Sequence, residues 1–389
     1  MPSATVRWGA WSENIDVTLD FPAGWTVSEH WPHDAPDMTA EEIAAVVGPP
    51  LRVLARGKQR PCIVIDDLTR PTRGDLLIPP LLDVLDVPAE DVLIVGGVAN
   101  HRPMVRSDLL KKLGPDVLAG CRFRNHFAWD NCKPVGETSR GTPIEINADY
   151  LACDLRVLVG SVIPHGGAGF SGGAKLLMPG IASNKSAHAY HTGPVMTGRY
   201  NVVETEARLD SEEAAGIVGV DYCVAMVPTS RMGVGAVTAG DVVAAHRAAV
   251  ERAQEILMTD APINADVGVF SLYPKDTEFL QHITALAPYK TASQPVVREG
   301  GTVVIIAAGS EGLGTHSLFG PGMRLEAPRP TRVKGRDLVF WCPGIERGEI
   351  DREYVVFRTW DETVAWLEAK HGAGATAAVF PCATAQLAR

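Results

Sequence analysis

The sequence has few of the features that mark secreted or membrane proteins. Its seven cysteines are dispersed and form no C-x-x-C pair, which argues against a disulfide framework and a structural zinc site. No stretch reaches the roughly 18 uninterrupted apolar residues of a transmembrane helix. The opening residues, MPSATVRWGAWSENIDV, lack the basic and apolar blocks of a secretory signal. We therefore expect a soluble, cytoplasmic protein with no membrane among its partners.

Positive charge is also scarce. The chain has 36 Lys and Arg against 46 Asp and Glu, a formal net charge of −10. Such an acidic chain is a poor candidate for binding nucleic acid, although a few local basic groups can still hold an anionic small molecule. Hydrophobic residues make up 46% of the 389 positions, so the composition is that of a folded globular protein with two or three domains.

Short β-branched runs alternate with helical patterns through most of the chain, which is typical of α/β proteins with a parallel sheet. Residues 61–66, 91–98 and 155–163 are predicted to be buried strands, and a helix is expected near 103–113.

Before these strands, Thr39 and Glu42 have the spacing of a capping box. They predict a short helix that ends near Gly48 and the two prolines behind it.

The alternation restarts near residue 266, after a long helix at 239–258, and includes a helix expected from Asp276. We predict two doubly wound α/β domains with the active site in the cleft between them. Residues 1–262 would form an N-terminal cofactor-binding and catalytic domain, and residues 263–389 a C-terminal α/β domain.

Each of the three predicted strands in the first half runs into an unusual polar loop. The loops read DLTRPT, ANHRPM and PHGGAGFSGGAK. Ligands of open α/β sheets bind at the carboxyl ends of the strands, so we expect the three loops to form one site.

The segment 164–191, which opens with the glycine-rich loop, carries the densest signal. Glycines let backbone N–H groups approach an anion closely, and a run of such groups suits a phosphate. The loop fits neither the P-loop nor the dinucleotide-binding pattern, because Ala174 separates Gly173 from Lys175 and Leu176 follows the lysine. From glycine content alone, a tight turn without a ligand is equally compatible. Lys175 could be a counter-ion, a covalent amine or a solvated surface side chain.

Four histidines lie in or after these loops: His101, His165, His188 and His191. Histidine exchanges protons near neutral pH, and two histidines on opposite sides of one carbon would suit a reaction at both faces. An H-x-x-H pair could also bind a metal, and any one histidine alone could be structural.

Charged residues near other strand ends complete the candidates. Asp67 and Arg70 could contact a ribose and clamp a carboxylate, or serve as a helix cap and a surface arginine. In the second half Lys275, Asp276 and Gln281 follow a predicted strand, and the segment 310–314 offers backbone donors; caps and turns are the alternative there.

Together the motifs resemble the lactate racemase family, whose members use a nickel-pincer nucleotide. The resemblance spans roughly residues 60–315. It rests on the segments DDLTRPT, NHRPM, PHGGAGFSGGAK, PGIAS, PKDTEFLQ and GSEGLG, together with His191. The block at 164–183 is its most specific part.

The resemblance implies a cofactor site. Lys175 is similar to the lysine that forms a thioamide with the cofactor, and His191 to the imidazole that binds nickel. Asp67 would lie near the cofactor, as would the glycine-loop residues Ser171, Gly172 and Gly173. No role is implied for His188.

The resemblance also implies a reaction. His101 and His165 would be the acid–base pair, Arg70 would orient the substrate carboxylate, and Gln281 would contact substrate. A hydride would leave C2 of a 2-hydroxy acid for the cofactor and return to the opposite face, which inverts the centre.

One departure bears on the substrate. Thr284 stands where family members acting on lactate have a lysine, and Leu280 stands in place of a tyrosine. Loss of that cation predicts an aliphatic or aromatic 2-hydroxy acid larger than lactate.

The other expected partners are the enzymes that build and load the cofactor, and a homo-oligomer stays open. A nicotinamide-dependent dehydrogenase, a metal-dependent hydrolase and a non-catalytic nucleotide-binding protein remain alternatives.

Overall fold

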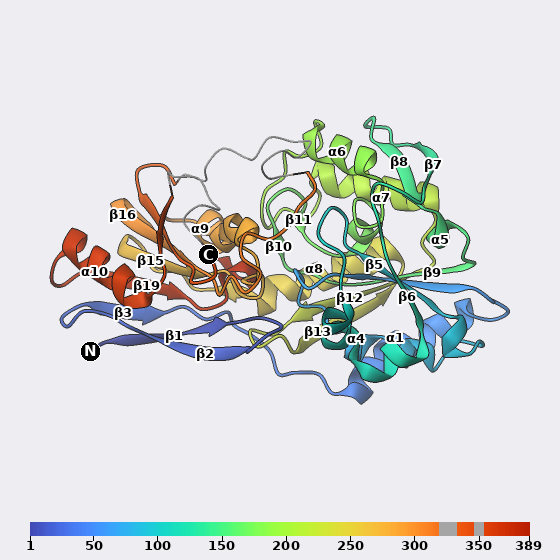
Figure 1. Ribbon diagram of the computed structural model, residues 1–389, viewed down its shortest axis with the longest axis horizontal. Coiled ribbons are helices and arrows are strands. Elements are labelled where there is room, and N and C mark those ends of the chain that lie inside the picture. The colour runs from blue at the N-terminus through green and yellow to red at the C-terminus, as the bar shows by residue number, and fades with distance from the viewer. Residues whose placement is uncertain (319–332, 346–353) are drawn as a thin grey trace.

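The computed structural model describes residues 1–318, 333–345 and 354–389. Two sheets dominate it, one in each half of the molecule (Figure 1). The first has six strands, all parallel except β13, in the order β13 (Val234–Gly240), β12 (Tyr222–Pro228), β9 (Leu155–Ser161), β4 (Pro61–Asp66), β5 (Leu93–Gly97), β6 (Arg122–Asn125).

Helices cover both faces of the first sheet, as Figure 1 shows. Every residue of β4 is buried, which explains its continuous run of apolar side chains. Its odd and even side chains enter two separate apolar clusters. One face packs against α1 (Ala40–Leu54) and α4 (Arg106–Gly120). The other packs against α6 (Asn184–Thr192), α7 (Glu206–Val218) and α8 (Val242–Ile256).

The second sheet has six parallel strands, in the order β18 (Val355–Phe357), β17 (Asp337–Trp341), β16 (Val297–Ile306), β15 (Ala265–Ser271), β19 (Thr376–Phe380), β3 (Thr26–Glu29). One face packs against α10 (Trp360–His371), and the other against the 3₁₀ helix η3 (Phe279–Leu286). The predicted α/β class with two mainly parallel sheets is confirmed.

The N-terminal segment lies with the second sheet, although the sequence placed it in the first domain of residues 1–262. Strand β3 pairs with β19, and the hairpin of β1 (Ser3–Trp8) and β2 (Ile15–Asp20) packs beside it (Figure 1). Trp8 stacks on Trp341 with ring centroids 4.5 Å apart. The hairpin buries its apolar face there, a contact across most of the chain that local pattern does not reveal. Otherwise the division at 262/263 stays a prediction.

Two helices differ from expectation. The capping box of Thr39 and Glu42 is confirmed, but α1 continues through both prolines to Leu54. It continues because Val47 and Leu51 extend its buried stripe across the prolines. No helix starts at Asp276, and η3 begins three residues later at Phe279. None of the helices in the described ranges combines the length and apolarity needed to cross a bilayer.

In each sheet the strand order reverses direction at one point, and ligands commonly bind at such points. In the first sheet the chain runs outward from β4 through β5 to β6, and then outward on the other side through β9. This reversal leaves a crevice at the carboxyl ends of β4, β5 and β9. The second sheet reverses in the same way between β15 and β19.

Candidate active site

One cavity of about 390 Å³ lies where these strand ends meet, lined by residues from both halves of the chain. Ten of the eleven predicted site residues line it: Asp67, Arg70, His101, His165, Ser171, Gly172, Lys175, His191, Gln281 and Thr284. Gly173 is not a lining residue. His188 also lies off the cavity wall and keeps no assigned role.

Lys112, a fully buried lysine on α4, stabilises the loop after β4. Its ammonium contacts Asp66 Oδ1 at 2.7 Å and donates to the carbonyls of Asp67 and Arg70 at 2.8 and 2.9 Å. The Arg70 guanidinium donates to Thr69, and no carboxylate of the described residues forms an ion pair with it. A cation held in this way at a cavity wall suits an incoming carboxylate.

Asp67 and His101 form a buried pair, with Oδ2 and Nδ1 2.9 Å apart. Burial opposes the charge of Asp67, but His101, Arg70 and the Thr69 hydroxyl outweigh it and lower the carboxyl pKa well below its usual range. Burial likewise lowers the pKa of His101, and the nearby carboxylates of Asp67 and Glu278 more than offset it, so that this pKa is raised. Asp67 therefore fixes His101 with Nδ1 protonated and leaves Nε2 to exchange a proton.

His165 has the opposite arrangement. Its Nδ1 accepts from the backbone N–H groups of Gly167 and Ala168 at 3.2 and 3.1 Å. Burial, with Lys175, Lys275 and other cations nearby, holds the His165 pKa well below its usual value. The ring is thus neutral near pH 7 with its proton on Nε2. The two imidazoles therefore differ: His101 lies beside a carboxylate and has a raised pKa, whereas His165 lies beside cations and has a lowered one.

The glycine loop follows β9, and two of its glycines combine a positive φ with close packing. Gly172 has φ +73°, and a Cβ there would lie 2.8 Å from the Ser161 carbonyl oxygen. Gly173 has φ +60° and packs against the His246 ring, so its place is behind the cavity. The Ser171 hydroxyl donates to the Ser161 carbonyl and accepts from Ile163 N–H, so it braces the loop.

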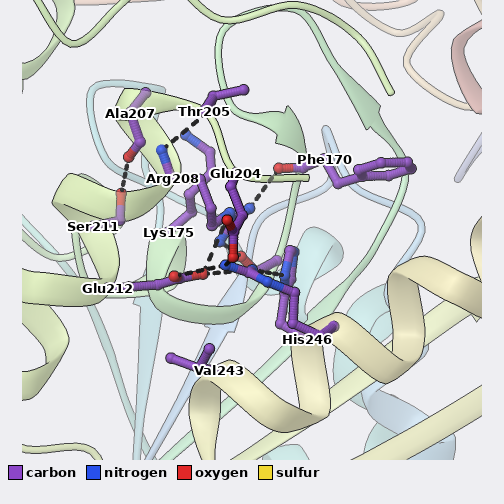
Figure 2. Close-up of polar contacts among 12 residues, drawn as sticks. Phe170, Lys175, Glu204, Thr205, Ala207, Arg208, Ser211, Glu212, Val243 and His246 are labelled. Atoms are coloured by element: carbon purple, nitrogen blue, oxygen red, sulfur yellow. Dashed lines mark hydrogen bonds and ion pairs between the residues drawn. The ribbon is translucent and has the colours of Figure 1, made fainter. Parts of the chain in front are cut away.

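Two buried residues that the sequence did not point to hold the loop carbonyls. Arg208 of α7 is fully buried and donates to the carbonyls of Gly172 and Phe170 at 2.9 and 2.6 Å. His246 of α8 lies 3.0 Å from the Ser171 carbonyl. Figure 2 shows these side chains converging on the loop from the two helices. With the carbonyls drawn toward the helices, the loop can present N–H groups to an anion.

Lys175 stands on the short 3₁₀ helix η2 (Gly173–Leu176) at the cavity wall. Burial, then the nearby guanidiniums of Arg208 and Arg70, hold its pKa well below the usual value. Its amine lies 3.5 Å from the Tyr190 hydroxyl, and no described carboxylate pairs with it. Burial and the lowered pKa favour the neutral, nucleophilic form of the amine, which separates Lys175 from a solvated surface lysine.

His191 lies on α6 and donates from Nδ1 to the Ala187 carbonyl at 2.6 Å. Burial lowers its pKa to about 4, so the ring is neutral. A third histidine, His316, lies close to both His101 and His191, with ring centroids 5.0 and 6.4 Å away. The sequence prediction missed His316, although it follows the GSEGLG loop by two residues and could have been found by the same strand-end argument.

The second half of the chain supplies the remaining wall through η3. Gln281 and Thr284 line the cavity together with apolar Leu280 and Ile283. The Thr284 hydroxyl donates to the Gln281 carbonyl at 2.7 Å and adds no charge. Lys275 also lines this wall, buried and with its pKa well below the usual value because of burial and Arg70.

Comparison with known proteins finds similarity to lactate racemases. Residues 19–202 match the lactate racemase N-terminal domain. Lactate racemase from Lactiplantibacillus plantarum is 29% identical over 281 residues, which is 69% of this chain and 65% of that protein. Over these residues the chain is similar to the lactate racemase family. A second lactate racemase, from Thermoanaerobacterium thermosaccharolyticum, is 29% identical over 279 residues, 69% of this chain and 64% of that protein. The matched part thus spans just under two thirds of each curated relative.

Solved structures show the same fold. The lactate racemase apoprotein from Thermoanaerobacterium thermosaccharolyticum superposes with a TM-score of 0.77 at 22% identity and covers all of both chains. A Thermotoga maritima protein superposes with a TM-score of 0.67 at 17% identity, covering 91% of this chain and 99% of that one. At these identities the likeness concerns the fold.

Proposed function

We propose that the protein inverts C2 of a 2-hydroxy acid larger than lactate, with a nickel-pincer nucleotide tethered to Lys175. One observation carries the proposal: a buried lysine amine faces the same cavity as two imidazoles, one held by a carboxylate and one by backbone N–H groups. A reaction at both faces of one carbon requires such a pair. Similarity to the lactate racemase N-terminal domain over residues 19–202 supports the same chemistry.

The chain's own residues would bind and orient the substrate. Arg70 pairs with the C1 carboxylate, since it lines the cavity and no described carboxylate neutralises it. His101 accepts the hydroxyl proton at Nε2, because Asp67 holds Nδ1 and stabilises the imidazolium that forms. When the opposite enantiomer is the substrate, His165 would accept the hydroxyl proton instead, which requires the tautomer with Nε2 unprotonated. The apolar side chains of η3 limit the access of water.

The residues present fit the cofactor that the resemblance implies. Lys175 would tether it, His191 would bind its nickel, and the N–H groups around Gly172 would meet its phosphate. Within the described ranges no group of three His, Cys, Asp or Glu side chains is placed to hold a metal ion. Nickel at His191 would thus need the cofactor's own soft donors. When bound, such a cofactor supplies the hydride acceptor that inversion requires.

The cavity wall supports a substrate larger than lactate. Thr284 is a small neutral side chain, and it lies beside Leu280, Ile283 and Met196. This wall offers space and apolar surface, and Thr284 adds no charge to it. Lactate should be a slower substrate than 2-hydroxy acids with a longer substituent, and a substrate panel measured by chiral chromatography tests this.

Intact-protein mass spectrometry with nickel analysis tests the tether, on protein co-expressed with the cofactor-building enzymes. We expect a nucleotide-sized adduct on Lys175 and about one nickel per chain. Lys175→Arg should carry neither, and Lys133→Arg, at an exposed position, should load normally. An unmodified wild-type chain beside a loaded lactate racemase control would contradict the proposal, and tight binding of a nicotinamide nucleotide would then support a dehydrogenase.

A further inference from the structure

A second cavity, of about 750 Å³, adjoins the first. The two share the side chains of His165, Met196, Ile283 and Thr284 as lining. A ligand held between the two histidines could therefore extend past Thr284 into the second cavity. Thr284 is also the position at which a family lysine is replaced by a neutral residue.

Tyr200 lines the second cavity and contacts both the loop of His165 and the η3 segment. Its ring lies 3.3 Å from where a Cβ on Gly166 would stand, next to His165. Its hydroxyl donates to the Ile283 carbonyl at 3.5 Å, and burial holds the Tyr200 pKa above its usual range. The ammonium of Lys290, which belongs to the short helix α9 (Ala287–Thr291), lies 5.7 Å from the ring centroid. Tyr200 thus connects the loop of His165 to Ile283 of η3 along one side of the second cavity.

The charge of this cavity is one-sided. Arg199 and Lys290 line it, and no aspartate or glutamate does. No carboxylate of the described residues forms an ion pair with either cation, in a protein whose net charge is −10. Partial desolvation lowers the Lys290 pKa, although both side chains stay exposed to solvent. An anion bound in this cavity could pair with both cations.

We propose that the second cavity binds a terminal carboxylate of the substrate, so that the preferred substrate is a dicarboxylic 2-hydroxy acid. The inference rests on the proposed function, which supplies the first carboxylate at Arg70 and the reacting C2 between the histidines. The chain of the acid passes Met196 and Thr284, and its far end meets Lys290 and Arg199.

The cofactor phosphate is the other anion that could use these cations. The geometry favours the substrate, because the shared wall of Ile283 and Thr284 belongs to the substrate side of the first cavity. The nucleotide phosphate has its own donors around Gly172, where Arg208 holds the loop carbonyls.

The test uses cofactor-loaded protein and the variants Lys290→Gln and Arg199→Gln, with Lys133→Gln as an exposed charge-matched control. The probes are lactate, 2-hydroxybutyrate, phenyllactate, malate, 2-hydroxyglutarate, 2-hydroxyadipate and glycerate 3-phosphate. Racemisation is followed by chiral chromatography, binding by calorimetry, and cofactor loading by intact mass.

We expect kcat/KM for the best diacid to exceed that for every monoacid by about tenfold or more, as one charge-assisted contact provides. Lys290→Gln should raise the KM and Kd of that diacid about tenfold while lactate values and cofactor loading stay unchanged. Lys133→Gln should change none of these.

Several results would overturn the inference. They are equal preference for monoacids and diacids, diacid binding that is insensitive to both variants, or reduced loading in Lys290→Gln, which would assign the cavity to the cofactor phosphate. Tightest binding of glycerate 3-phosphate would make phosphate the preferred anion and contradict the carboxylate. Loaded protein that turns over no 2-hydroxy acid contradicts the proposed function instead, and diacid calorimetry still tests the anion site.

Discussion

At the scale of single residues, the neighbours of each imidazole determine which nitrogen is protonated and the direction in which its pKa is displaced. His101 has a carboxylate at Nδ1, whereas His165 has two backbone N–H groups at the same atom. Identical side chains therefore hold their protons on different nitrogens and have pKa values displaced in opposite directions. This asymmetry follows from chain geometry and does not depend on the substrate.

Asp67→Asn should lower the His101 pKa, because the amide removes the charge that stabilises the imidazolium. The raised His101 pKa stabilises the folded protein below the unfolded value of about 6.5, and this contribution is lost as pH rises through the folded pKa. The lowered Asp67 pKa contributes above about pH 3.9 and is lost only in stronger acid. The stability deficit of the variant should thus be largest near pH 5 and shrink toward pH 9. An unchanged His101 titration by NMR would refute this.

Arg208→Met should destabilise the glycine loop. The substitution leaves the buried carbonyls of Phe170 and Gly172 without their donors, at a cost of about 3 kcal/mol in the free energy of unfolding. It should also raise the Lys175 pKa, because a neighbouring positive charge is gone. Denaturant unfolding and the pH dependence of Lys175 acylation measure the two effects. Arg140→Met, which removes surface ion pairs, should leave both nearly unchanged.

At the scale of elements, the turn from β9 into η2 depends on backbone conformation. Gly172→Ala should be much more destabilising than Gly57→Ala, although the two glycines have φ of +73° and +74°. Both substitutions impose the left-handed strain of about 1 kcal/mol, but only at Gly172 would the Cβ meet a carbonyl oxygen at 2.8 Å. Thermal unfolding compares the two, and equal melting temperatures would show that the turn relaxes.

The central elements were predictable because their signals are local. The continuous apolar runs of β4, β5 and β9 gave their positions to within about two residues. The end of α1 was predicted wrongly, because Gly48 and the prolines are local stop signals whereas Leu51 is buried by tertiary packing.

Asp276 shows why other parts were not predictable. Its carboxylate accepts from the backbone N–H groups of Gly9 and Ala10 at 2.7 and 3.0 Å, across more than 260 residues. Burial raises the pKa of this carboxyl to about 6. A helix start and a long-range anchor for the N-terminal hairpin look alike in sequence, and only packing separates them.

At the scale of the whole molecule, the site exists because two halves meet along the loops after β5 and β16. The backbone of His101 bridges to that of His316, and the Asn100 amide donates to the Ser317 hydroxyl at 2.8 Å. Arg102 joins the halves with a two-point contact to Glu311 and also donates to Asp108 at 2.6 Å. These contacts connect the NHRPM and GSEGLG motifs, whose pairing the sequence did not reveal.

Arg102 and Glu311 should be coupled energetically. In a double-mutant cycle of Arg102→Gln and Glu311→Gln, we expect a coupling of about 1 kcal/mol in the free energy of unfolding and a loss of kcat/KM in each single variant. The loss arises because His101 adjoins Arg102 and shifts with it. Strictly additive effects would mean that the pair does not hold the halves together.

The candidate residues were found from sequence because each follows a strand, but their contacts were not. The Asp67–His101 pair, the buried Lys112 and Arg208, and His316 became visible only when the strand ends met. Residue type and position after a strand indicate which residues line a site. Three-dimensional packing determines the protonation and orientation of their side chains.

Inversion at C2 by hydride return is the central claim, and isotope retention tests it most directly. Cofactor-loaded protein is incubated in ordinary water with one enantiomer of C2-deuterated substrate, 2-hydroxyglutarate first and then the other acids. The inverted product is separated by chiral chromatography, and its deuterium content is measured by mass spectrometry. The account predicts inverted product that keeps its deuterium. Inverted product with deuterium exchanged for solvent hydrogen, or no inversion of any acid by fully loaded protein, would contradict it.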